Sequence, residues 1–431
     1  MNTQSGLPLC FVCIYVEKQE MTKKIGVIFL FVCWSVCALA QPDSLSVAER
    51  NALQGFNDTI DRLAEDFVTV SLVVCDPGDF LFSSFGHAVL RLQCPTFDKD
   101  YIFSYESEDK KGHWLRFLRG DLKEGLFGIP SDSYFQYCRA EERGVVEYKL
   151  KLSPTQEMEL WKNLDELVAR GTKLPYDYYT RGCALSIVNV VKSTLHNISI
   201  EYNEWPEKFD GTLRELGYEC VSKAQQPWNR FVLMTLAGSG IDNPHIQKEK
   251  KLIVPADLAE VWQHATINSE MLLEKEPHFI VPPTLKKTQQ WFTPLVICII
   301  LLILEFCSLI TLWIPQRGLQ IVGRVIDYSI LATVTFIGVI VTYTVLFSSL
   351  PCTNWNWLII PFNILPILAW YWRKYWAIPW AFLLTIWSII MTCESLWGHI
   401  LVEWAHIVLT ITFVIIIIKQ NKTKRYEKES I

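Results

Sequence analysis

The last third of the chain limits its fold more than any other feature, because it is far more apolar than a soluble domain requires. From Thr293 onward, long apolar stretches alternate with short polar ones. An α-helix needs about 20 mostly apolar residues to cross a hydrocarbon layer about 30 Å thick, and the third stretch is short by this measure. We predict an all-α, five-helix transmembrane bundle within residues 291–431, with helices at residues 294–314, 326–347, 357–372, 376–393 and 400–418.

The basic residues of this region fall in alternate loops. They are Arg317, Arg324, Arg373, Lys374, Lys419 and the basic residues that follow it. The loops at residues 348–356 and 394–399 contain neither Lys nor Arg. Because Lys and Arg accumulate in cytoplasmic loops, we predict a cytoplasmic C-terminal tail and an N-terminal domain on the outside.

An independent signal at the N-terminus also predicts export. Residues 1–40 are interpreted as an N-terminal extension followed by a secretory signal peptide, in which Lys23 and Lys24 precede an apolar run. Small residues around Ala40 form the cleavage site, and a start at Met21 would give the signal a short basic end. Residues 41–290 are therefore predicted to form an exported domain.

The exported domain mixes strand and helix signals, which predicts an α+β fold. Alternating or β-branched segments predict strands at residues 68–75, 87–93, 101–105 and 144–152. The sequence Ser-Pro-Thr-Gln at residues 153–156 is a capping box with proline at the first helical position, and it predicts a helix ending at Gly171.

Cys183 stands where a loop meets a predicted helix. Apolar residues repeat after it at the spacing of one helix face, at Ala184, Val188, Val191 and Leu195. Unpaired N–H groups at a helix start favour a thiolate, and Arg181 would act in the same direction. We therefore predict that the pKa of the Cys183 thiol is lowered.

The alternative for Cys183 is a buried structural thiol or one half of a disulfide. If it stays reduced, up to two disulfides could form among the other cysteines of the domain. These are Cys75, Cys94, Cys138 and Cys220. His87, at the start of a predicted strand, favours the catalytic interpretation, since an imidazole can take the thiol proton and the thiolate can then attack an ester or amide carbonyl.

Several segments together resemble a known family. They are FGHAVLRL, YIFSYE, the Tyr137, Glu142 and Arg143 segment, and YDYYTRGCA. Over residues 68–258 the chain resembles the Lnb-type periplasmic domain of Bacteroidota envelope proteins, and the tail with NWNWLIIPFNILP looks similar too. The resemblance implies a permuted papain-like (NlpC/P60-related) fold. Named members are lipoprotein N-acyltransferases, which acylate the α-amine of a lipoprotein's N-terminal diacylglyceryl-cysteine.

The resemblance also implies roles for individual residues. Cys183 would be the nucleophile and His87 its base, in a multi-pass protein of the bacterial inner membrane with a periplasmic N-terminal domain. A phospholipid would donate the acyl chain through a thioester, and a lipoprotein N-terminus would accept it. Gly182 departs from the asparagine that often precedes this cysteine. By fold analogy, the residues that could orient His87 are Ser104, Tyr105 and Glu106.

Ionisable residues also occur in the predicted membrane helices. Such groups are costly in a bilayer and usually face the bundle interior or a cavity. We predict that five of them line a polar cavity that opens outward and admits the lipid donor, namely Glu305, Glu394, His399, Glu403 and His406. A metal site is not favoured, because one helix cannot complete a coordination sphere, and no cofactor is predicted.

Two other classes of function stay open at this level. A papain-like peptidase or amidase acting on envelope peptides or peptidoglycan would use the same pair, although one membrane anchor would suffice for it. A non-catalytic envelope sensor or assembly protein is the second, and Gly182 is the feature that favours it. The sequence shows no phosphate-binding glycine loop and no basic stripe, which argues against a nucleic-acid partner.

Overall fold

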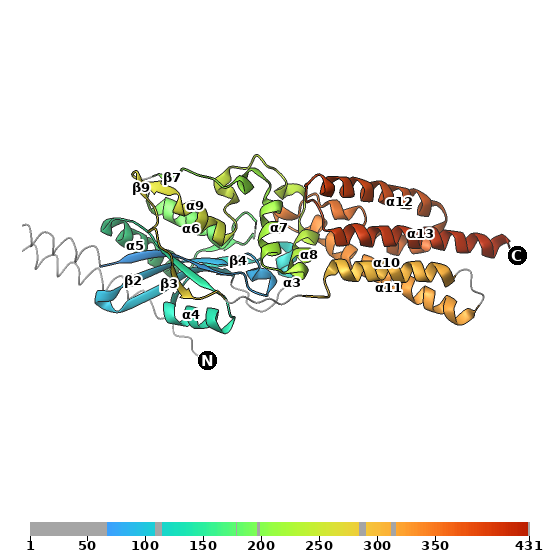
Figure 1. Ribbon diagram of the computed structural model, residues 1–431, viewed down its shortest axis with the longest axis horizontal. Coiled ribbons are helices and arrows are strands. Elements are labelled where there is room, and N and C mark those ends of the chain that lie inside the picture. The colour runs from blue at the N-terminus through green and yellow to red at the C-terminus, as the bar shows by residue number, and fades with distance from the viewer. Residues whose placement is uncertain are drawn as a thin grey trace, which may run out of the picture.

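The chain forms an N-terminal domain built on a β-sheet and a C-terminal bundle of long helices, joined end to end (Figure 1). The computed structural model describes residues 67–107, 114–177, 179–195, 199–283, 290–311 and 316–429. The predicted signal peptide, its start at Met21 and its cleavage after Ala40 lie outside these residues. The prediction of an α+β domain followed by a helical one is confirmed.

The main sheet is antiparallel and has the strand order β10-β5-β1-β2-β3-β4-β6. Its strands are β1 (Thr69–Cys75), β2 (His87–Cys94), β3 (Lys99–Ser107), β4 (Lys123–Pro130), β5 (Val145–Lys149), β6 (Lys173–Pro175) and β10 (His278–Val281). A smaller sheet contains β7 (Ile200–Tyr202), β8 (Ala265–Ile267) and β9 (Glu270–Met271). The interior strand β1 is a nearly continuous apolar run because helices cover both faces of the sheet.

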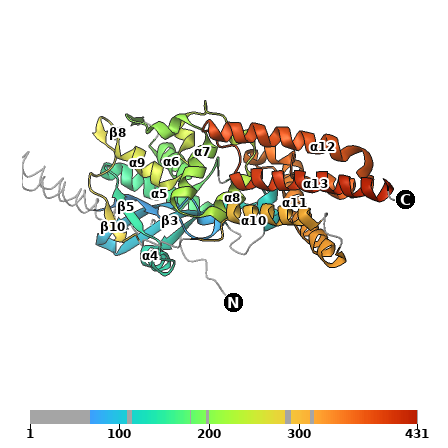
Figure 2. The ribbon, with the colours of Figure 1, turned by 45° about the vertical axis from the view of Figure 1, so that its right-hand side comes forward.

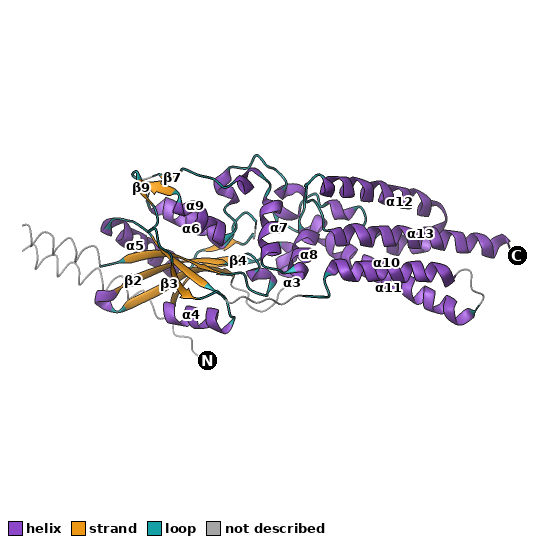
Figure 3. Cartoon of the chain, viewed as in Figure 1, coloured by secondary structure: helices purple, strands orange, loops and turns teal. Residues whose placement is uncertain are grey.

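Helices flank the main sheet on two sides (Figure 3). One face packs against α5 (Pro154–Arg170), α6 (Cys183–Thr194) and α9 (Pro255–Gln263), and the other packs against α4 (Ser131–Ala140). The predicted capping box at Ser153 and Gln156 is present, and Gly171 ends α5 with φ +58°. The other α-helices in the described part of the domain are α3 (Trp114–Arg119), α7 (Leu213–Lys223) and α8 (Pro227–Leu236).

The C-terminal bundle contains α10 (Pro294–Ile310), α11 (Arg317–Phe347), α12 (Leu365–Leu396) and α13 (Trp404–Glu429). Two helical segments, Arg317–Phe347 and Ala377–Leu396, are long and apolar enough to cross a bilayer, and Pro294–Ile310 and Trp404–Gln420 are shorter apolar helices.

The prediction of five membrane helices is not confirmed. The segments predicted at residues 357–372 and 376–393 are not separated, since one helical element runs from Leu365 to Leu396. The start of the first segment is instead a 3-10 turn, Trp357–Ile359. The predicted break rested on Arg373 and Lys374, but Arg and Lys are good helix formers and do not by themselves end a helix.

The N-terminal domain and the bundle share part of one hydrophobic core. Leu350 and Cys352, in the loop after α11, are buried within the core cluster of the N-terminal domain. Both views place α8 beside the start of α10 (Figure 1 and Figure 2). At this junction Asn356 Nδ2 donates to the Thr235 carbonyl at 2.8 Å, and Ser349 N–H donates to the Arg119 carbonyl at 2.9 Å. The bundle therefore completes the N-terminal domain rather than merely tethering it.

Candidate active site

Cys183 is the first residue of α6, as predicted. Gly182 occupies the N-cap position with extended backbone (φ −76°, ψ 170°) and makes no side-chain cap. A capping side chain would accept hydrogen bonds from the N–H groups of the first turn. Glycine has no such side chain, so these N–H groups can donate to the Cys183 sulfur instead. The N–H groups of Ala88, Ala184 and Cys183 itself all act on the sulfur of this half-buried residue.

The predicted thiolate is wrong for this resting structure. Burial raises the pKa of the Cys183 thiol to about 11, and the Glu124 carboxylate adds to the increase. The three backbone N–H groups lower the pKa, but they do not outweigh the loss of solvent. The charge of Arg181 lowers the pKa of Glu124, whereas the main influences on the thiol are burial, the backbone N–H groups and Glu124. The thiol therefore needs a base when it attacks.

His87, the first residue of β2, is held by its surroundings. It follows Gly86, where φ is +84° and a Cβ would stand 2.6 Å from the Cys75 carbonyl oxygen, so glycine is required. The His87 Nε2 atom lies 2.8 Å from Ser104 Oγ. Burial lowers the pKa of His87 to about 4, with Glu106 opposing this and Arg143 adding to it. The imidazole is therefore neutral at neutral pH and can accept a proton.

The Cys183 sulfur comes close to the backbone of β2 where β2 and β3 separate. The β2–β3 ladder begins only at Leu90 and Phe103, so His87 and Ala88 precede it. The Cys183 sulfur lies beside the Ala88 N–H, which belongs to the peptide that joins Ala88 to His87. No direct hydrogen bond joins the thiol to the imidazole within the described residues, and such bonds often tighten only when substrate binds. Because Nε2 of His87 is hydrogen-bonded to Ser104, the ring nitrogen that can accept the thiol proton is Nδ1.

The three residues proposed to orient His87 differ in how they relate to its imidazole. Ser104 is the one that hydrogen-bonds the imidazole. Glu106 acts on His87 through its charge, which opposes the lowering of the imidazole pKa. Tyr105 alternates to the other face of β3, where burial and Glu124 raise the pKa of its hydroxyl to about 12.

Glu124 is a site residue that the sequence analysis missed. It lies on β4, is 2% exposed, and accepts a hydrogen bond from Ser186 Oγ at 3.2 Å. Burial raises the pKa of Glu124 to about 7, against the opposing effects of Ser186 and Arg181. One signal could have revealed it: Glu124 alternates with Leu122 and Leu126, so it is a charged residue on the apolar face of a strand.

The site lies close to the loop that the bundle inserts into the N-terminal domain. Burial raises the pKa of the Tyr176 hydroxyl, and both Cys183 and Cys352 contribute to the increase. Tyr176 is thus near both the nucleophile and the loop after α11. This arrangement sets the cysteine at the end of the N-terminal domain that faces the bundle.

The five ionisable residues predicted to line one cavity do not come together. Glu394 and His399 pair at 2.8 Å on the surface. Glu403 binds Arg230 of α8, with 2.5 Å between Oε1 and Nε, and His406 Nε2 lies 2.8 Å from Thr235 Oγ1, also on α8. These latter two contacts fasten α13 to the N-terminal domain.

Glu305 lies far from the other four residues of the predicted cavity. It contacts Lys419, which lies 15 residues beyond Trp404, the first residue of α13, or about 22 Å along the helix. The prediction of one cavity is wrong, because buried polar groups here satisfy one another or the N-terminal domain. Among the described residues, no group of three or more His, Cys, Asp or Glu side chains could hold a metal.

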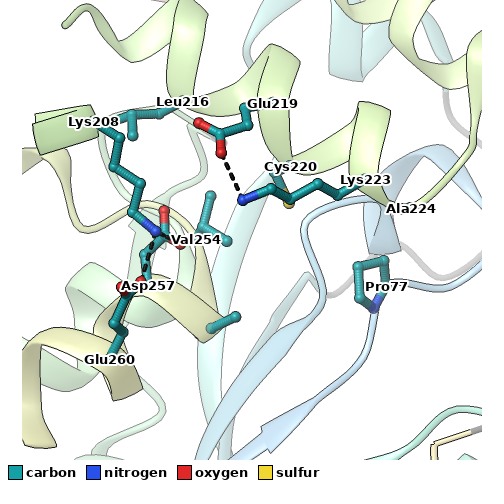
Figure 4. A pocket seen from close by; sticks show the side chains of 11 residues that line it. Pro77, Lys208, Leu216, Glu219, Cys220, Lys223, Ala224, Val254, Asp257 and Glu260 are labelled. Carbon is teal, nitrogen blue, oxygen red and sulfur yellow. Dashed lines mark hydrogen bonds and ion pairs between the residues drawn. The ribbon is translucent and has the colours of Figure 1, made fainter. Parts of the chain in front are cut away.

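A pocket of about 360 Å³ lies between α7, α9 and the loop after β1 (Figure 4). It contains neither Cys183 nor His87. Its two lysines are ion-paired: Lys208 with Asp257 and Glu260, and Lys223 with Glu219. Because its lysines are already paired with carboxylates, we assign this pocket no part in the chemistry of Cys183.

Four cysteines of the N-terminal domain besides Cys183 were candidates for disulfides. Cys75 Sγ and Cys138 Sγ are 3.6 Å apart in the interior, where β1 meets α4. Cys94 lies at the end of β2 and Cys220 lines the pocket on α7. None of the five cysteines of the N-terminal domain forms a disulfide in the part of the chain that the structure describes.

Fold and site together define a membrane protein whose sheet domain carries a helix-start cysteine beside the strand that begins with His87. The family model of the Lnb N-terminal periplasmic domain matches residues 56–214, and that of the Lnb transmembrane domain matches residues 286–428. The two matches together span more than half of the chain, which belongs to the Lnb-type family with an N-terminal periplasmic domain and a C-terminal membrane domain. No curated protein and no solved structure matches the chain significantly.

Proposed function

We propose that the protein is a cysteine-dependent acyltransferase of the inner membrane that N-acylates lipoproteins from a phospholipid donor. The observation that carries this proposal is the position of Cys183, at a helix start and beside the peptide of His87. A cysteine helix packed on an antiparallel sheet next to a histidine strand is also what a papain-like (NlpC/P60-related) fold would provide, and we propose that fold for the domain.

The first half-reaction moves the acyl chain to the enzyme. His87 Nδ1 takes the thiol proton, and the Cys183 sulfur attacks the ester carbonyl of the donor. The N–H groups of Cys183 and Ala184 stabilise the oxyanion. The C–O bond then breaks, the alkoxide of the lysophospholipid takes the proton from His87, and a thioester remains on Cys183.

The second half-reaction delivers the chain to an amine. The nitrogen of the acceptor attacks the thioester carbonyl, the C–S bond breaks, and an amide forms while the sulfur regains a proton. Ser104 holds the imidazole by Nε2 throughout, so that Nδ1 stays directed to the reacting atoms.

The exposed tryptophans support a membrane surface at the junction between the domains. Trp291, Trp355 and Trp397 lie in loops at the end of the bundle that faces the N-terminal domain, and each is at least 75% exposed. Tryptophan is enriched at membrane interfaces. On this basis we propose a multi-pass topology with a cytoplasmic C-terminus and with the cysteine close to the lipid head groups of the outer leaflet.

The test is capture of the acyl-enzyme. Purified protein in nanodiscs is mixed with a phospholipid carrying a labelled acyl chain, and hydroxylamine-sensitive label on Cys183 is measured by peptide mass spectrometry. A diacylated lipopeptide is then added and the amide product is quantified. We expect no label and no product for Cys183→Ala and Cys183→Ser, and a loss of about 10²–10⁴-fold for His87→Ala.

The matched control is Cys220→Ala, a second partly exposed cysteine of the N-terminal domain that lies outside the site. This variant should keep both label and product. A folded Cys183→Ala protein that still N-acylates the lipopeptide would overturn the proposal. Cleavage of envelope peptides without any amide product would favour the peptidase class instead.

A further inference from the structure

Glu124 sits beside the helical turn that carries the nucleophile. Its Oε1 accepts from Ser186 Oγ at 3.2 Å, and Ser186 follows Cys183 by three residues on α6. Residues three apart are neighbours on a helix face. The carboxylate, itself only 2% exposed, therefore flanks the position that the thioester would occupy.

The groups that interact with Glu124 come from three neighbouring parts of the fold. Cys183 and Ser186 belong to α6, Tyr105 to β3, and Tyr176 and Arg181 to the segment between β6 and α6. Glu124 raises the pKa values of Cys183, Tyr105 and Tyr176, and Arg181 lowers that of Glu124. Within the described residues no salt bridge reaches the Glu124 carboxylate, and its hydrogen-bond partner is a hydroxyl.

This placement works against the first half-reaction. A negative charge beside Cys183 makes its thiol harder to ionise, and a buried carboxylate without a direct ion pair is costly in itself. Neither effect helps the formation of the thioester, so a role for Glu124 has to be sought in another step. The second half-reaction offers such a role, because the amine that accepts the acyl chain arrives as an ammonium cation.

We propose that Glu124 is the proton acceptor for the incoming ammonium group and thereby selects amines over water as acyl acceptors. The inference rests on the proposed function and assigns its acceptor step to a residue. An α-ammonium group must lose two protons to become an amide N–H. A single imidazole beside the thioester can pass on only one of them.

The protons balance as follows. The ammonium gives its first proton to the Glu124 carboxylate, and the neutral nitrogen attacks the thioester carbonyl. His87 takes the second proton from the nitrogen and passes it to the Cys183 sulfur as the C–S bond breaks. The products are the amide and the free thiol, and Glu124 then releases its proton to solvent. Hydrolysis differs, because water needs only the imidazole, so Glu124 is not required for it.

The experiment separates the two half-reactions in the full-length protein in nanodiscs. Acyl-enzyme is first formed with the labelled phospholipid, and a diacylated lipopeptide with a free α-amine is then added between pH 6 and pH 9. For Glu124→Gln, which keeps the acceptor for Ser186, we expect normal or faster acyl-enzyme formation and unchanged slow hydrolysis. Transfer to the amine should fall about 10²-fold at pH 7.

The pH profile supplies a readout that a merely structural role would not move. With the carboxylate absent, transfer should wait for the amine to deprotonate by itself, so the rise in rate should move up toward the α-amino pKa of about 7.7–8.0. Glu124→Asp should restore part of the transfer. The control is Glu157→Gln, since Glu157 is also a buried carboxylate with a pKa raised to about 8, but lies on α5 beside the Val70 N–H.

Each outcome has a separate meaning. No acyl-enzyme in the wild-type protein would reject the proposed function itself. Wild-type acyl-enzyme with an unchanged transfer rate and pH profile in Glu124→Gln would reject only this inference. Failure of Glu124→Gln to form acyl-enzyme, while Glu157→Gln forms it, would also reject the inference and assign Glu124 to the first half-reaction.

Discussion

Two buried glutamates, Glu305 in the bundle and Glu124 in the N-terminal domain, have opposite surroundings. Glu305 is fully buried and lies 3.4 Å from the ammonium of Lys419. Glu124 is 2% exposed and hydrogen-bonds the Ser186 hydroxyl, with the charge of Arg181 acting from the neighbouring loop. The comparison shows that the bundle places a cation directly against its buried carboxylate, whereas within the described residues no salt bridge reaches Glu124.

The bundle cluster, which comprises Glu305, Ser308, Asp327 and Lys419, connects three helices. Lys419 of α13 lies 2.6 Å from Asp327 Oδ1 of α11 and also contacts Ser308 and Glu305 of α10. It lies toward the end of the bundle opposite the N-terminal domain. A buried cation between two carboxylates fixes how the helices pack, because any other arrangement would leave a charge uncompensated.

The largest expected effect on stability is that of Lys419→Met. The substitution leaves two buried carboxylates without their cation, which should cost about 3–5 kcal/mol of unfolding free energy. Unfolding in detergent micelles, followed by tryptophan fluorescence, measures this. The triple variant Lys419→Met, Glu305→Gln and Asp327→Asn removes all the charges and should recover most of the loss. A single variant as stable as wild type would show that the cluster does not hold the bundle together.

Glu124→Gln should have a smaller effect on stability, of opposite sign and dependent on pH. The folded-state pKa of Glu124, about 7, lies above the value of about 4.3 for an unfolded chain. Its contribution to stability is therefore fully present below pH 4 and is lost as pH rises through 7. The variant should match wild type near pH 4 and be more stable by about 3–4 kcal/mol at pH 8.5.

The measurement is the difference in unfolding free energy between the two proteins across this pH range. Parallel stability curves at all pH values would mean that Glu124 is compensated in the folded protein as well as Glu305 is. The contrast between the two regions would then disappear.

Ser104→Ala should show the smallest change in stability and a clear change in rate. One lost hydrogen bond to His87 costs about 1 kcal/mol, while a misdirected imidazole should slow acyl-enzyme formation by about 10²-fold. Rates of labelling and unfolding free energies are measured on the same preparation. Ser71→Ala, a buried serine on β1, is the control and should keep the full rate. Equal rates in both variants would remove Ser104 from the site.

Features with a local signal could be predicted from the sequence. The helix start at Cys183, the strands carrying His87 and Ser104, and the capping box at Ser153 all depend on residues a few positions apart, and the structure confirms them. The choice of Ser104 among three candidates could not be made in this way. It depends on where the β2–β3 ladder begins, which is a matter of strand register.

Features that depend on residues far apart in the sequence, or on opposing influences on a pKa, were missed or predicted wrongly. Glu124 lies 62 residues from Ser186, and Glu305 lies 114 residues from Lys419, which the sequence analysis treated as a loop charge. The lowered pKa of Cys183 was wrong because the cost of burial, which no sequence pattern reports, exceeded the effect of the helix start.

The insertion of Leu350 and Cys352 into the core of the N-terminal domain has a consequence for how the protein is made. Both residues emerge from the ribosome after α10 and α11, whereas β10, the last strand of the main sheet, ends at Val281. In the proposed topology the N-terminal domain cannot finish packing until α10 and α11 have inserted and returned this loop to its side of the membrane. Maturation of the candidate site would then be tied to the order of membrane insertion.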